Sequence, residues 1–74
     1  IMKSVWVFQD LTEGIVRIFA QEEDAKKFAL DYFVETFQKY WDEDYGPFEP
    51  EVERFKENWC ADEGLMRLDE VEVE

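Results

Sequence analysis

The chain of 74 residues is short, acidic and rich in aromatic side chains. A chain of this length buries only about 60% of its unfolded surface and builds one hydrophobic core, so we expect residues 1–74 to form a single domain. Hydrophobic residues make up 46% and charged residues 38%, which excludes a disordered or linker-like protein. The net charge of −12 disfavours direct binding to nucleic acid or to anionic membranes, because both would repel the chain.

Several kinds of active site lack the residues they need. The chain has no His and a single Cys, Cys60, so it cannot assemble a Ser-His-Asp triad, a Cys-His pair, a His-ligated metal site or an internal disulfide. The acidic run 42–44 is followed by Gly46, one position too early for a calcium-binding EF-hand loop. The longest apolar stretch, 5–8, is far shorter than a membrane span of about 20 residues. We therefore expect a cytoplasmic, non-enzymatic protein without metal or cofactor.

Residues 3–19 are predicted to form a β-hairpin, because two short runs of β-branched and aromatic side chains flank a connection that ends in Gly14. Alternation places Val5 and Val7 on one face of the hairpin and their aromatic neighbours on the other. Since both faces are apolar, something must cover the second face.

Residues 21–42 are predicted to form a long helix, whose apolar side chains span an arc of roughly 240°, against about 100° for an ordinary surface helix. Such a helix must be covered on two sides, by the sheet and by another element. The acidic residues of its first turn, 22–24, are placed where the helix dipole favours anions.

The second half of the chain predicts a short helix and a final strand. Pro50 is suited to the start of a helix that runs to about Cys60, and we interpret Cys60 as a small buried apolar residue. Residues 65–73 alternate like a strand, but the phase changes at 69–70, which predicts a bulge there or a strand that ends near Leu68. The order β-β-α-α-β predicts an α+β domain with a small antiparallel three-stranded sheet, one long helix and one short helix.

The negative charge is concentrated in one half of the sequence. Residues 1–40 carry a net charge of −2, whereas residues 41–74 carry −10. In the acidic half, two rows of carboxylates have spacings of about 6 to 7 Å, on a helix and on a strand respectively. These rows are either a solvated surface that keeps the protein soluble or an imitation of DNA phosphates. The first row consists of Glu49, Glu53 and Glu57, and the second of Glu70, Glu72 and Glu74.

The chain has 13 aromatic residues, which belong either to the core or to a binding surface. A small sheet and two helices have few interior positions, so we expect some aromatic side chains to face a partner. The candidate aromatic patch lies around the end of the long helix and the following loop, at Tyr40, Trp41, Tyr45 and Phe48.

Two resemblances bear on function. The runs 5–8, 15–19, 21–29 and 66–71 resemble small uncharacterised bacterial and phage proteins of hairpin-helix-strand design, a likeness that implies no known activity. The segments 8–10 and 68–69 are more faintly similar to the dimeric uracil-DNA glycosylase inhibitors of Bacillus phages. That second resemblance implies an acidic protein that acts by DNA mimicry.

Two functional hypotheses follow. The first is an acidic, non-enzymatic protein-protein interaction protein of phage or mobile-element type that associates with itself as a homodimer. The second is a DNA-mimic inhibitor that presents its acidic half to the basic surface of a DNA-binding enzyme or nuclease. The expected partner is thus a protein with a basic surface or a second copy of the chain, and neither nucleic acid nor a membrane. Salt separates the two hypotheses, because charge-driven mimicry weakens as ionic strength rises.

Overall fold

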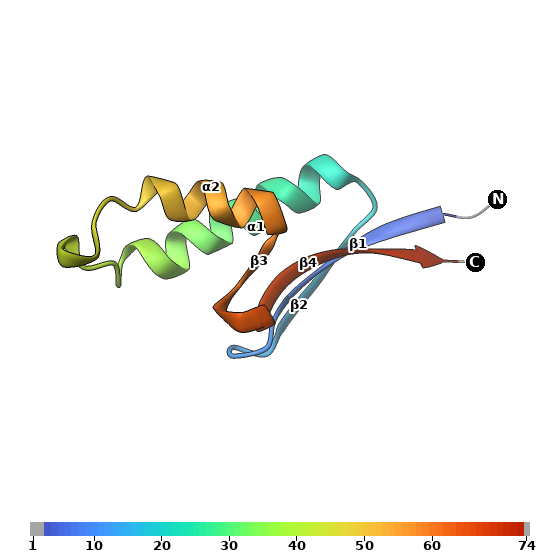
Figure 1. Cartoon of the computed structure of the whole chain (residues 1–74). Coiled ribbons are helices and arrows are strands. Elements are labelled where there is room, and N and C mark those ends of the chain that lie inside the picture. The colour runs from blue at the N-terminus through green and yellow to red at the C-terminus, as the bar shows by residue number, and fades with distance from the viewer. Residues whose placement is uncertain (1–2, 74) are drawn as a thin grey trace.

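The computed structural model describes residues 3–73 and shows an antiparallel sheet with two helices on one of its faces (Figure 1). The α+β class expected from the sequence is confirmed, but the sheet has four strands instead of three. The additional strand is a two-residue segment after the second helix, and its first residue, Cys60, was expected at the end of that helix. In chain order the elements are β1 (Lys3–Asp10), β2 (Ile15–Phe19), α1 (Glu22–Gln38), α2 (Glu49–Asn58), β3 (Cys60–Ala61) and β4 (Met66–Val73), with 3-10 turns at Glu43–Tyr45 and Asp62–Gly64.

The strand order in the sheet is β2-β1-β4-β3, so the first and last long strands lie side by side at its centre. β1 pairs with β4 along all eight of its residues, from Lys3 opposite Val73 to Asp10 opposite Met66. β2 pairs only with the second half of β1, beginning with Phe19 opposite Trp6. The β1–β4 ribbon therefore extends beyond the helices, with both chain ends at the same end of the molecule (Figure 1).

β4 is a regular strand from Met66 to Val73, so both alternatives expected from the sequence, a bulge at 69–70 and a strand that ends near Leu68, are wrong. Leu68 lies opposite Phe8 and Val71 lies opposite Val5, in one uninterrupted register. Because neighbouring residues of a strand point to opposite faces, Leu68 joins the face under the helices and Val71 the other face. The phase change in the sequence marks a strand that is apolar first on one face and then on the other.

α1 lies between the sheet and α2, which agrees with its broad apolar surface. Phe33 of α1 stacks on Phe55 of α2, with ring centroids 4.4 Å apart, and both side chains are buried. α1 ends at Gln38, earlier than the apolar pattern indicates. After Gln38 the chain continues in 3-10-type turns, in which the amides of Tyr40 and Trp41 donate to carbonyls three residues back.

The core lies between α1, α2 and the helix-covered face of the sheet. Phe8, at the centre of the sheet, has no exposed surface and makes edge contacts with Phe28 and Tyr32 at centroid distances of 5.4 and 5.0 Å. The buried apolar residues are Phe8, Ala25, Ala29, Phe33, Phe55, Met66 and Leu68.

Asp10, at the end of β1, is the one buried charged residue of the described chain. Its Oδ1 accepts hydrogen bonds from the backbone amides of Thr12 and Glu13, at 3.1 and 3.4 Å, and so organises the hairpin loop. Its Oδ2 accepts a hydrogen bond of 2.6 Å from the Tyr32 hydroxyl of α1. One carboxylate thus connects the hairpin loop to the long helix. Gly14 completes the loop at φ 70°, as its position in the sequence predicted.

The Tyr32 hydroxyl predicts a loss of stability at high pH. Burial, and then the hydrogen bond to Asp10, raises its pKa from 10.0 to about 12. Since the folded protein holds this proton more tightly than the unfolded chain, stability falls as the pH rises from 10 towards 12. Urea unfolding across this pH range should show the free energy of unfolding of the wild type falling relative to that of Tyr32→Phe. If absorbance shows all three tyrosines ionising together near their ordinary pKa, the prediction fails.

Candidate partner-binding surfaces

The face of the sheet turned away from the helices, here called the outer face, is apolar and uncovered within the described chain (Figure 1). The strand register places six branched side chains on it. Ile18 of β2 is 66% exposed and Val71 of β4 is 43% exposed, although Ile and Val are among the residue types most often buried in proteins. The six residues of the outer face are Val5, Val7, Val16, Ile18, Val71 and Val73.

The outer face is nearly neutral in a strongly acidic protein. Its charged side chains are Lys3, Arg67 and Asp69, which give it +1 and leave −13 on the rest of a chain whose total is −12. Arg67 Nε and Asp69 Oδ2 form an ion pair at 3.0 Å. Cys60 lies opposite Arg67 and is exposed, so the expectation that it is a buried apolar residue is wrong. Its position on an edge strand keeps it out of the core.

The predicted acidic residues lie on the helix side of the sheet. Glu49, Glu53 and Glu57 are exposed on α2, while alternation places Glu70 and Glu72 of β4 on the helix-covered face, beyond the helices. The end of α2 is joined to β4 by the hydrogen bond from the Leu68 amide to the Trp59 carbonyl, at 2.9 Å. Both carboxylate rows are thus on one side of the sheet and the outer face is on the other. The remaining predicted residue, Glu74, lies outside the described residues.

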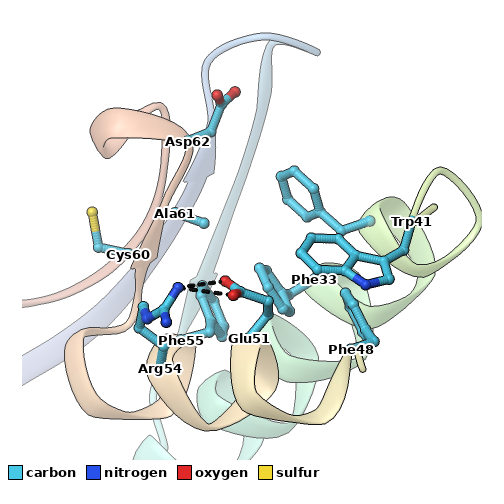
Figure 2. Close-up of a pocket in the computed structure, with 10 residues that line it drawn as sticks. Phe33, Trp41, Phe48, Glu51, Arg54, Phe55, Cys60, Ala61 and Asp62 are labelled. Atoms are coloured by element: carbon cyan, nitrogen blue, oxygen red, sulfur yellow. Dashed lines mark hydrogen bonds and ion pairs between the residues drawn. The ribbon is translucent and has the colours of Figure 1, made fainter. Parts of the chain in front are cut away.

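A pocket of about 270 Å³ opens between α1, α2 and β3 (Figure 2). The stacked rings of Phe33 and Phe55 lie at its base, and Phe37, Trp41 and Phe48 contribute the other aromatic surfaces. Trp41 and Phe48 meet edge to face at 5.4 Å. The indole N–H of Trp41 donates to the Gly46 carbonyl at 2.7 Å, which fixes the ring at the pocket edge.

The rim of this pocket is polar. Arg54 Nη1 donates to both carboxylate oxygens of Glu51, at 2.8 Å each, across the α2 side of the opening (Figure 2). Asp62, Ala61 and Cys60 form the opposite side. The lining therefore offers an apolar interior and an already paired cation, an arrangement suited to binding an apolar group.

The structure brings together three of the four residues of the predicted aromatic patch. Trp41 contacts both Tyr45 and Phe48 edge to face, each at 5.4 Å, and two of these three rings line the pocket. Tyr40 is 76% exposed and lines a separate hollow beside the hairpin loop. Phe33 and Phe55 were not among the predicted site residues, because their helical spacing is the same as that of core residues.

Within residues 3–73, no three Asp, Glu or Cys side chains converge as metal ligands would. Neither described helix has the length and apolar content to cross a membrane. No family model matches the chain, and no curated protein or solved structure shows significant similarity to it. The structure itself shows an α+β domain, in which two helices cover one face of a four-stranded antiparallel sheet and leave an apolar outer face.

Proposed function

We propose that this protein is a small, acidic, non-enzymatic protein-protein interaction protein that associates with a second copy of itself through the outer face. The supporting observation is the set of six branched apolar side chains on one face of the sheet, of which four are exposed and two, Val5 and Val7, are half-buried. Exposed apolar patches of this kind usually mark interaction surfaces in water-soluble domains.

Charge favours a second copy as the occupant of the outer face. A partner with a basic surface would be attracted to the carboxylates on the helix side of the sheet. It would not be attracted to the outer face, whose net charge is +1. Two copies related by a twofold axis bring identical apolar patches together without opposing carboxylate rows. Two sheets of the same twist also pack well face to face, with strand directions about 30° apart.

The small area of the outer face indicates that this association is weak. β1 and β4 pair over eight residues. At about 3.4 Å per residue and about 4.8 Å between strands, these two strands and the five residues of β2 present roughly 340 Å² per copy. A standard interface buries about 800 Å² per partner, so we expect a weak dimer with a dissociation constant on the order of 10–100 μM.

Sedimentation equilibrium at different salt concentrations tests the dimer. We expect the dissociation constant to fall between about 0.1 and 1 M NaCl, because the Debye length shortens from about 10 Å to about 3 Å and screens the repulsion between two acidic copies. Ile18→Lys should weaken the dimer at least about tenfold, since it places an unpaired ammonium group in the interface.

Tyr40→Lys is the matched control. It adds the same charge at an exposed side chain away from the outer face and should leave the dissociation constant nearly unchanged. A monomer at all salt concentrations up to about 200 μM would contradict the proposal, given the expected affinity. Equal dimerisation of Ile18→Lys and Tyr40→Lys would place the interface elsewhere.

A second candidate function, DNA-mimic inhibition, is supported by the position of the two carboxylate rows. Both rows are on the helix side, where a partner could bind while the outer face is occupied by a second copy. The carboxylates are spaced about 6 Å apart on α2 and about 6.7 Å apart on β4. A basic DNA-binding groove could contact such rows in place of phosphates.

An inhibition assay with a bacterial uracil-DNA glycosylase and a uracil-containing duplex tests this candidate. Inhibition should weaken steeply between about 0.1 and 1 M NaCl, in the opposite direction to dimerisation. A fourfold variant with Gln at Glu53, Glu57, Glu70 and Glu72 should lose the inhibition. A control with amides at four exposed α1 carboxylates should keep it, at Glu23, Asp24, Asp31 and Glu35. Lack of inhibition at low salt would exclude this enzyme as the target.

A further inference from the structure

We propose that the pocket between α1, α2 and β3 binds one aromatic or branched aliphatic side chain of a partner segment whose neighbouring residues are Lys or Arg. This inference concerns a surface on the helix side of the sheet and goes beyond the self-association proposed for the outer face. It does not depend on that dimer.

The size of the pocket limits what it can hold. Its volume of about 270 Å³ lies at the small end of the volumes usual for small-molecule and cofactor sites, about 300–1,000 Å³. A single side chain entering from a partner protein is a better match, because interface hot spots are apolar anchors that fill individual pockets. The aromatic rings of Phe33 and Phe55 at the base would contact such an anchor directly.

The charge around the pocket determines what must flank the anchor. The charged residues of the lining are Glu51, Arg54 and Asp62, and α2 beside the pocket carries three more exposed carboxylates, at Glu49, Glu53 and Glu57. Arg54 is already paired with Glu51, and Lys56 lies 3.6 Å from Glu53, so the cations of this region are occupied. A segment with cationic residues on both sides of its anchor complements this surface, whereas an acidic segment would be repelled.

Exposure of the lining supports an entering group. Trp41 and Phe48 are only half-buried, although each packs against the other and, for Trp41, against Tyr45. Their remaining surface faces the opening between the Glu51–Arg54 ion pair and β3 (Figure 2). Filling the pocket would remove this aromatic surface from water without breaking the Trp41–Gly46 hydrogen bond.

The test uses three capped pentapeptides and the nitrogen-15 NMR spectrum of the full chain. The first peptide has phenylalanine between two pairs of lysines, the second has alanine at the centre, and the third has glutamates in place of the lysines. We expect the first to shift the Trp41 indole signal and the amide signals of Phe48 and Ala61. The other two should bind at least about tenfold more weakly, because each lacks either the buried anchor or the complementary charge.

A variant that fills the pocket provides an independent measurement. Ala61→Leu should weaken binding of the first peptide at least about tenfold, since the larger side chain occupies part of the cavity. Ala20→Leu, the same change at an exposed position, should bind like the wild type. If Ala61→Leu does not give a dispersed NMR spectrum, the comparison of the three peptides on the wild type decides alone.

Three results would overturn the inference. Equal binding of the phenylalanine and alanine peptides would mean that charge alone attracts them. Equal binding of the lysine and glutamate peptides would remove the role of the acidic surroundings. Signal changes confined to the outer face or to Tyr40 would place the binding site elsewhere. The dimer itself is measured separately, without peptide.

Discussion

Phe8→Ala is expected to leave a large fraction of the chain unfolded at 25 °C. Phe8 has no exposed surface and contacts aromatic rings of α1 from the centre of the sheet. Removing a buried phenylalanine side chain costs about 3–5 kcal/mol, because it loses transfer free energy and leaves a cavity. A domain of this size has a total stability of only about 4–11 kcal/mol, and the lower part of this range is usual for such small cores.

Urea unfolding followed by circular dichroism measures this effect. Val16→Ala is the control, because Val16 lies on β2, on the outer face, and is 50% exposed. It should cost less than about 1 kcal/mol in dilute solution, where the protein is monomeric. Loss of stability by less than about 2 kcal/mol in Phe8→Ala would contradict the placement of this ring at the centre of the core.

Asp10→Ala is expected to cause the second-largest loss, about 2–3 kcal/mol. The change removes the acceptor for the amides of Thr12 and Glu13 and for the Tyr32 hydroxyl. Donors that lose a buried partner keep the cost of leaving water, which exceeds the net gain from making the bond. The hairpin loop and α1 would therefore lose their connection in one substitution.

A double-mutant cycle with Tyr32→Phe separates the two roles of Asp10. The coupling energy between Asp10→Ala and Tyr32→Phe should be at least about 0.5 kcal/mol, because the two groups share one hydrogen bond. Asp31→Ala is the matched control, since it removes an exposed carboxylate from the same turn of α1 and should change stability by less than about 0.5 kcal/mol. Additive effects of the two substitutions would show that the Asp10–Tyr32 bond contributes nothing.

The sequence predicted the features that depend on local periodicity. Alternation in residues 3–19 correctly separated Val5 and Val7 from Phe8, and positive φ at Gly14 followed from the hairpin. The same alternation implied an apolar second face and an element to cover it, and as far as the sequence alone could tell α2 was free to be that element. Packing of Phe55 against Phe33 places α2 on the helix side instead.

Other features depend on contacts between distant residues, and the sequence pattern does not contain them. A strand of two residues, such as β3, has no periodicity to recognise, and its pairing with Met66 and Arg67 is visible only in three dimensions. The pocket combines side chains from positions 33 to 62, and the local sequence around each of them is typical of a core position or a loop. Asp10 offered a signal, since an Asp at the start of a loop often accepts amides two and three residues on. Its partner Tyr32, 22 positions away, offered none.

The central pairing of β1 with β4 has a consequence for synthesis on the ribosome. Its partners are separated by 56 to 70 positions, so the middle of the sheet closes only after nearly all described residues are available. Until then the β1–β2 hairpin is made of strands with two apolar faces and an unpaired edge, the form in which strands most readily join those of other chains. Pairing over such distances is slow because a long loop must close first. Most of the negative charge lies in the half of the chain that is translated last, so repulsion from other chains protects the early hairpin least.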